Sequence, residues 1–150
     1  MISLVTLRAR NHHPGGDPGN VVLRSLELIK TAVPSGASAV QVHVNGVQWV
    51  GVCPDPGSEA GWLPALVTIT FIDSGPRATV VSHIDSVLGS FGWQRKDTTT
   101  PQKGLIPHWT IRERSGSAGN AFAYPTPVGS PDWFMTATWQ PPGPVARTCP

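Results

Sequence analysis

The clearest hydrophobic pattern in the chain has the period of an α-helix and lies within residues 73–93. Its apolar positions share one helical face: Val80, Ile84, Val87, Leu88 and Phe91. Asp73 and Ser74 can accept hydrogen bonds from the free amides at the helix N-terminus, and Pro76 suits the first turn. Gly92 can take the left-handed conformation that ends many helices, and the apolar Trp93 follows it. The pattern therefore predicts a helix with one buried face.

Alternation of apolar and polar residues predicts strands on both sides of this helix. Residues 66–72 precede it, and their inward side chains should pack against Ile84, Leu88 and Phe91; these are Val67, Ile69 and Phe71. Residues 133–139 alternate most clearly, with one face formed by Trp133, Met135, Ala137 and Trp139. The other face carries Phe134, Thr136 and Thr138. Two shorter strands are expected, over residues 108–112 and 121–124.

The N-terminal half repeats this alternation of helix and strand. Residues 21–33 have a helical stripe, with Asn20 as the N-cap and with Val22, Leu26, Ile29 and Val33 buried. Residues 39–44 alternate as a strand that directs His43 to solvent. Asn45-Gly46 is the strongest short hairpin signal and predicts a tight turn into a strand over residues 47–52.

The order of helix, strands, helix and strands predicts an α+β fold. We expect a two-layer sandwich in which two helices pack on one mainly antiparallel sheet. Two αββ halves are compatible with this order, because Gly61-Trp62 and Gly92-Trp93 occupy similar places in the two halves. Residues 1–19 are expected to form a flexible N-terminal arm, and residues 20–150 a single domain.

Composition excludes several classes of partner. Only 13% of the residues are charged and the net charge is +2, which leaves no basic stripe for nucleic acid. No apolar run is long enough to span a membrane. Residues 1–7 are too short for the apolar region and cleavage site of a signal peptide. The chain is therefore expected to be cytoplasmic, or to be exported by a signal outside these residues.

The two cysteines bear on the compartment. Cys53 lies in a turn-forming stretch and Cys149 is the penultimate residue, and neither has the spacing of a metal site. A disulfide that tethers the C-terminus is the favoured interpretation, and it indicates an oxidising compartment. Two unpaired buried thiols in a reducing cytoplasm are the alternative.

Catalytic motifs are missing, and no metal or cofactor site is expected. His43, His83 and His108 are the histidines on predicted helices and strands, and His43 and His108 would meet if their strands were neighbours. The six tryptophans are the more unusual feature. Most should belong to the core, but a pocket or flat aromatic face for a sugar, lipid or peptide would also use them. The candidate ligand-contacting aromatics are Trp62, Trp109 and Trp133.

A set of short motifs gives the chain a family resemblance. The set comprises Cys53, Gly61-Trp62, the helix that ends at Gly92-Trp93, Trp109, Trp133 with Ala137, and a Pro-Gly pair before Cys149. Over residues 34–149 this pattern resembles small envelope lipoprotein domains of actinobacteria. The resemblance implies an extracytoplasmic location and a disulfide between the two cysteines, and it implies no activity.

Three functional hypotheses follow. The first is a non-enzymatic extracytoplasmic binding or structural module of a cell envelope, whose partner is an envelope protein, a glycan or a lipid. The second is a small hydrolase or isomerase that uses a histidine and a nearby carboxylate. The third is a cytoplasmic partner-binding domain, which requires unpaired cysteines.

Overall fold

The computed structural model describes residues 29–53, 55–101, 104–114, 116–141 and 147–150. Strands make up 49% of them and helix 14%, and one complete helix accompanies a six-stranded antiparallel sheet. The predicted α+β sandwich with two helices and αββ halves is therefore wrong, because the described chain is mostly β. The polar, turn-rich residues 94–107 contain three short strands that the sequence pattern did not indicate. The first predicted helix lies largely outside the described residues, and the predicted N-terminal arm lies entirely outside them.

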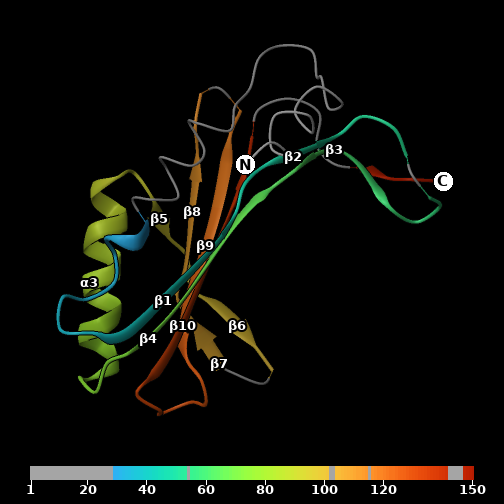
Figure 1. The fold of residues 1–150 in the computed structure, drawn as a ribbon. Helices are drawn as coiled ribbons and strands as arrows, with labels where there is room; N and C mark the ends of the chain where they lie inside the picture. The colour runs from blue at the N-terminus through green and yellow to red at the C-terminus, as the bar shows by residue number, and fades with distance from the viewer. Residues whose placement is uncertain (1–28, 54, 102–103, 115, 142–146) are drawn as a thin grey trace, which may run out of the picture.

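The main sheet is antiparallel throughout and has the strand order β1-β4-β10-β9-β8-β5. Its strands are β1 (Ser38–Asn45), β4 (Ala65–Ile72), β5 (Gln94–Arg95), β8 (His108–Arg112), β9 (Ala118–Pro125) and β10 (Asp132–Gln140). The helix α3 (Arg77–Ser90) runs along one face of this sheet (Figure 1). The strands predicted at residues 66–72 and 133–139 are confirmed as β4 and β10, each slightly longer than expected.

The core lies between α3 and the sheet. Its largest contributions come from the alternate residues that the sequence pattern assigned to the inner faces of β4 and β10: Val67, Ile69, Phe71, Trp133, Met135, Ala137 and Trp139. Across from them α3 buries Val80, Val81, Ile84 and Leu88. The prediction that Phe91 is buried is wrong, because Phe91 is 40% exposed. Phe91 is the residue at which the chain leaves the helix, so its side chain no longer follows the buried face.

The end of α3 confirms the predicted glycine exit. Gly92 has a φ of 91°, and its N–H donates to the carbonyl of Gly89 at 3.0 Å. The N–H of Trp93 donates to the carbonyl of Leu88 at 3.1 Å, which completes a Schellman motif. The buried side chains of Leu88 and Trp93 both belong to the core at this point. The start of α3 differs from expectation, because Pro76 occupies the cap position and Asp73 instead accepts the N–H of Gly75.

The predicted hairpin at Asn45-Gly46 is wrong. These two residues lie where β1 continues towards β2 (Gln48–Val50). β1 pairs with β4, and β2 pairs with β3 (Glu59–Leu63). Two long ribbons therefore run side by side, and the turn between them falls at residues 51–58 (Figure 1). The favoured two-residue hairpin turns need positive φ at the first or at both central residues, and neither Asn45 nor Gly46 has it.

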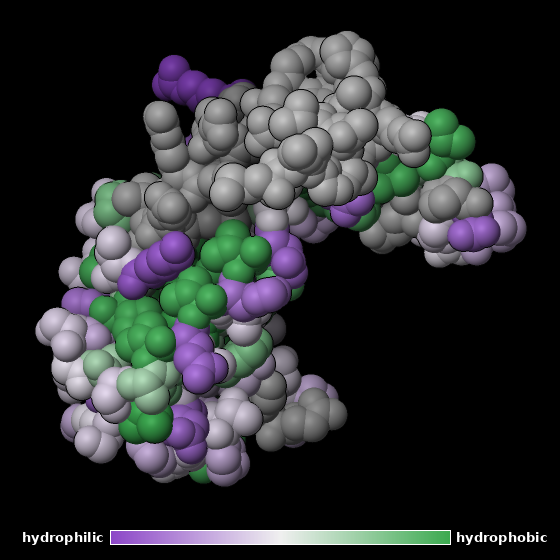
Figure 2. All heavy atoms as spheres, viewed as in Figure 1, coloured by the Kyte–Doolittle hydropathy of each residue, from purple (hydrophilic) through white to green (hydrophobic). Residues whose placement is uncertain are grey.

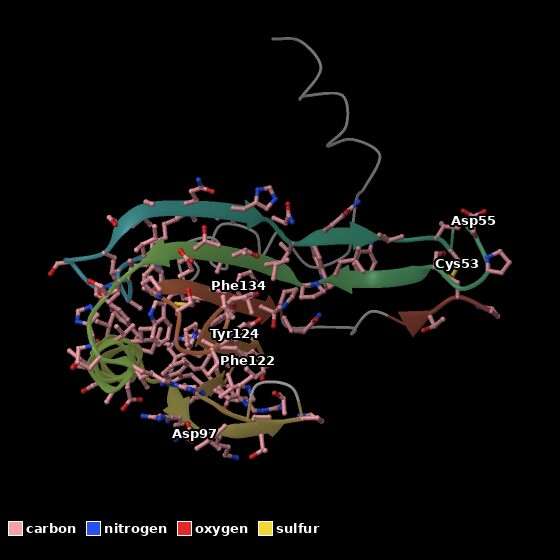
Figure 3. All side chains as sticks on the ribbon, turned by 90° about the horizontal axis from the view of Figure 1, so that it is seen from below. Cys53, Asp55, Asp97, Phe122, Tyr124 and Phe134 are labelled. Carbon is pink, nitrogen blue, oxygen red and sulfur yellow. A yellow bond between two sulfur atoms is a disulfide. The ribbon has the colours of Figure 1, made fainter. Side chains whose placement is uncertain are left out.

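The far end of the two ribbons extends beyond the main sheet. We call this part, formed by β2, β3 and β11 (Arg147–Thr148), the arm. There β11 pairs with β3, and the disulfide between Cys53 and Cys149 is formed, as predicted. The N–H of Gly57 donates to the carbonyl of Cys149, and the N–H of Cys149 donates to the carbonyl of Ser58. Figure 3 shows this closed end, with Cys53 and Asp55 labelled. The bridge thus ties the C-terminal strand to the turn between β2 and β3.

A small hairpin completes the described structure. Its strands, β6 (Thr98–Thr100) and β7 (Gly104–Ile106), lie beside the β5–β8 edge of the main sheet, where Arg77 of α3 donates to the carbonyl of Leu105. Within the described residues, no helix has the length and apolar character needed to cross a membrane.

Candidate ligand-binding face

The side of the main sheet opposite α3 is not covered by a second layer of described residues. We call this surface the open face. The arm projects on this side of the sheet (Figure 1), the β6–β7 hairpin lies at the β5–β8 edge, and the space-filling view is hollowed between the arm and the hairpin (Figure 2). Because successive strand residues point to opposite faces, each strand that feeds the core also supplies side chains to the open face.

Strand pairing arranges these side chains in three rows that cross the sheet. The first row is Gln41, Thr70, Phe134 and Tyr124. The second row is His43, Thr68, Thr136, Phe122 and His108. The third row is Asn45, Leu66, Thr138, Asn120, Thr110 and Gln94. None of the three rows contains a lysine, arginine, aspartate or glutamate.

Aromatic rings form the centre of the open face. His108 and Phe122 stack with their ring centroids 4.2 Å apart and their planes 8° apart. Tyr124 and Phe134 form a tilted pair at 5.5 Å. Phe122, Tyr124 and Phe134 lie close together on the side of the sheet away from α3 (Figure 3). All four rings are half-buried, so part of each remains available to a ligand.

Hydrogen bonds hold His108 in its stacked position. Its Nδ1 lies 3.1 Å from the hydroxyl of Thr98 on β6, and its Nε2 lies 3.1 Å from Oδ1 of Asn120 on β9. The contact with Asn120 requires a proton on Nε2, since the amide oxygen only accepts. The ring is therefore fixed from both sides before a ligand arrives.

Two hollows lie on the open face, one at each end. A hollow of about 360 Å³ involves Gln41, Thr70 and Phe134 of the first row and is bordered by Asp132. A hollow of about 410 Å³ at the other end involves three residues of the third row: Asn120, Thr110 and Gln94. The second row, with the His108–Phe122 stack, lies between these two ends. An elongated ligand could thus contact both hollows and the stack at once.

A larger hollow of about 590 Å³ lies on the other side of the molecule, between α3 and a wall formed by Arg95, Asp97, Leu105 and Pro107. Its charged groups are engaged with the protein itself. Arg95 donates to both carboxylate oxygens of Asp97, and this hydrogen bond raises the pKa of Arg95. Arg77 donates to the carbonyl of Leu105, and Asp85 accepts the indole N–H of Trp109 at 2.8 Å. These contacts tie α3 to the sheet and to the β6–β7 hairpin, which is a structural role.

The three tryptophans predicted to contact a ligand are buried. Trp62 is 6% exposed and packs edge-on against Trp49 in the arm. Trp109 is 0% exposed, and Trp133 is 3% exposed and stacks on Phe71 in the core. Their contact with a ligand remains a prediction. The described aromatic residues that do reach the open face are the four rings of the His108–Phe122 and Tyr124–Phe134 pairs.

The histidines do not form the pair with a carboxylate that the hydrolase or isomerase hypothesis requires. His43 is exposed to solvent, as predicted. His43 and His108 share the second row, but three strands separate them. Nε2 of His83 is buried without a hydrogen-bond partner. In the part of the chain that the structure describes, no histidine lies within hydrogen-bond distance of a carboxylate, and no group of three metal-ligating side chains gathers.

Sequence reasoning missed the open face, although part of its signal was present. The alternation of β10 separates Phe134, Thr136 and Thr138 from the buried tryptophans, so one residue of each row was assigned to this face of β10. The neighbours of these residues depend on strand order and register, which the sequence does not reveal.

No family model, curated protein sequence or solved structure matches the chain. The resemblance to actinobacterial envelope lipoprotein domains therefore remains a prediction from short motifs.

Proposed function

We propose that this protein is a non-enzymatic binding module of a cell envelope and that it holds a glycan on the open face. The observation that carries the proposal is the His108–Phe122 stack in the second row, surrounded by uncharged hydrogen-bonding side chains. A sugar ring has apolar C–H groups on its faces and hydroxyl groups around its edge. An aromatic ring complements the first, and the hydroxyls and amides of threonine, asparagine and glutamine complement the second.

Other classes of ligand fit the open face less well. A lipid chain needs a continuous apolar surface, whereas most side chains in the three rows are polar. A nucleic acid needs a run of cations, and the rows contain none. The four rings already pack against one another, and hydrogen bonds already hold His108. Little side-chain entropy of the protein is therefore lost on binding, and a rigid ligand would lose little of its own.

The extracytoplasmic part of the proposal is supported by the disulfide between Cys53 and Cys149. Disulfides persist in oxidising compartments and are rare in a reducing cytoplasm. The full-length protein should therefore be cleaved by an external protease on intact cells of its own host. Cleavage only after lysis would refute an outward-facing location.

Binding is tested on an array of oligosaccharides built from hexoses, pentoses and N-acetylhexosamines, followed by calorimetric titration of the best probe. Phe122→Ala and Tyr124→Ala should each weaken the affinity about tenfold or more, because the loss of an aromatic anchor at the centre of an interface costs roughly 1–2 kcal/mol. Phe91→Ala is the matched control, since Phe91 is exposed at the end of α3 on the opposite side of the sheet. Absence of binding to every probe, or unchanged affinity in both open-face variants, would contradict the proposal.

A further inference from the structure

The two ends of the open face differ in charge. Lys96 and Arg112 border the 410 Å³ hollow at the β5–β8 end, and the residues lining that hollow include no carboxylate. Asp132 borders the 360 Å³ hollow at the opposite end, and the residues lining that hollow include no cation. A ligand that crosses the neutral rows would therefore meet positive charge at one end and negative charge at the other.

Backbone pairing places both cations next to the neutral rows. The N–H of Lys96 donates to the carbonyl of His108, so Lys96 lies beside His108, at the edge of the sheet where the second row ends. Arg112 pairs with Ala118 on β9, two residues beyond Thr110 along β8. That spacing puts Arg112 about 7 Å beyond the third row. The two cations thus lie on either side of the pair formed by Gln94 and Thr110.

These cations are not neutralised by described carboxylates. Arg95, which separates Gln94 from Lys96, points to the other face and pairs with Asp97. Among the described residues, neither Lys96 nor Arg112 lies within ion-pair distance of an acidic side chain. A structural explanation like that for Arg95 therefore does not apply to them.

We infer that the glycan held on the open face is acidic, and that Lys96 and Arg112 bind its anionic group at the β5–β8 end. The inference rests on the proposed function and names the chemical class of the ligand. The guanidinium of Arg112 can bind a carboxylate or a phosphate through two parallel hydrogen bonds, and the ammonium of Lys96 adds a point charge. Gln94 and Asn120 supply neutral donors in the same hollow.

The charge difference also orients the ligand. An anionic group near Asp132 would be repelled, whereas the same group near Lys96 and Arg112 is attracted. An acidic oligosaccharide should therefore bind in one direction, with its charged residue at the β5–β8 end and its neutral residues on the His108–Phe122 stack.

The test uses hexaoses of glucose, galactose and mannose, each in a neutral form, a form oxidised to the uronate at C6, and a 6-phosphorylated form. The wild-type protein should bind at least one acidic form about threefold to tenfold more tightly than its neutral counterpart, and the preference should fall as salt is raised. The uronate and phosphate arms identify which anionic group is preferred.

Lys96→Gln and Arg112→Gln should each reduce this preference, and the double variant should bind acidic and neutral forms equally while retaining affinity for the neutral form. Lys30→Gln is the control, because it removes the same charge from an exposed residue that lines neither hollow of the open face. Equal binding of acidic and neutral forms by the wild type, or a preference that survives the double variant, would overturn the inference and leave the proposed function standing. Failure to bind any hexaose would overturn the inference, and failure to bind any probe of the oligosaccharide array as well would overturn both.

Discussion

Gly119 on β9 provides a sharp test of the packing in the core. A Cβ atom at this position would lie 2.5 Å from Cη2 of Trp93, 2.9 Å from Cε3 of Trp139 and 3.0 Å from Cγ2 of Ile111. The two indole rings form an edge-to-face pair with centroids 5.8 Å apart, and both are buried. Gly119→Ala therefore inserts a methyl group where no space exists.

The cost follows from how little the neighbours can move. Trp93 is anchored by its backbone hydrogen bond to the carbonyl of Leu88, and Trp139 lies within a central strand. Overpacking of this kind costs roughly 1–3 kcal/mol, partly offset by the lower chain entropy of alanine in the unfolded state, about 0.4–1 kcal/mol. We expect a net loss of about 1–2 kcal/mol, which corresponds to a fall in Tm of roughly 2–8 °C for a domain of this size.

The same substitution in α3 should act in the opposite direction. Gly89 is exposed in the last turn of the helix, and an added Cβ would meet no atom within 4 Å. Gly89→Ala should stabilise the protein by up to about 1 kcal/mol, because alanine has the higher helix propensity. Urea titrations followed by tryptophan fluorescence measure both variants. The packing described for Gly119 is refuted if Gly119→Ala is as stable as the wild type.

Three further substitutions test separate contacts. Leu88→Ala should cost roughly 2–5 kcal/mol in urea titrations, whereas Phe91→Ala should cost clearly less, because only Leu88 is fully buried; equal costs would contradict the burial seen here. Asp85→Ala should cost about 1–3 kcal/mol, because it leaves the buried indole N–H of Trp109 without an acceptor, and an unchanged Tm would show that this hydrogen bond is replaceable. Cys149→Ser opens a loop of 96 residues and should cost at most about 4.7 kcal/mol, with early proteolysis of the arm; a protease-resistant arm would show that strand pairing alone holds it.

The sequence predicted those features that depend on neighbouring residues. The period of residues 80–88, the glycine exit at Gly92, and the alternation of β4 and β10 are local patterns, and the structure confirms them. Asn45-Gly46 was also a local signal, but it was wrong, because pairing of the flanking segments with β3 and β4 keeps the chain extended there. Tertiary pairing outweighed the turn propensity of two residues.

The candidate site could not be predicted in the same way, because it depends on the order of strands that are distant in sequence. The second row joins His43, Thr68, Thr136, Phe122 and His108, which come from five different strands. No spacing within the chain indicates that they are neighbours. Trp62, Trp109 and Trp133 were predicted to contact a ligand because tryptophan is unusually frequent in the chain. Their large apolar surfaces are buried instead, and this burial is stabilising.

Because alternate side chains of a strand point to opposite faces of the sheet, the same strands contribute to both the core and the candidate site. On β10 the odd-numbered residues from Trp133 to Trp139 fill the core. The even-numbered residues between them, Phe134, Thr136 and Thr138, lie on the open face. A substitution on the open face leaves the packing against α3 in place, since its side chain lies on the other side of the sheet. Binding and stability should thus be separable at these positions, so a loss of glycan binding in Phe122→Ala with unchanged unfolding would mark the open face as a surface for a ligand and not as a second core.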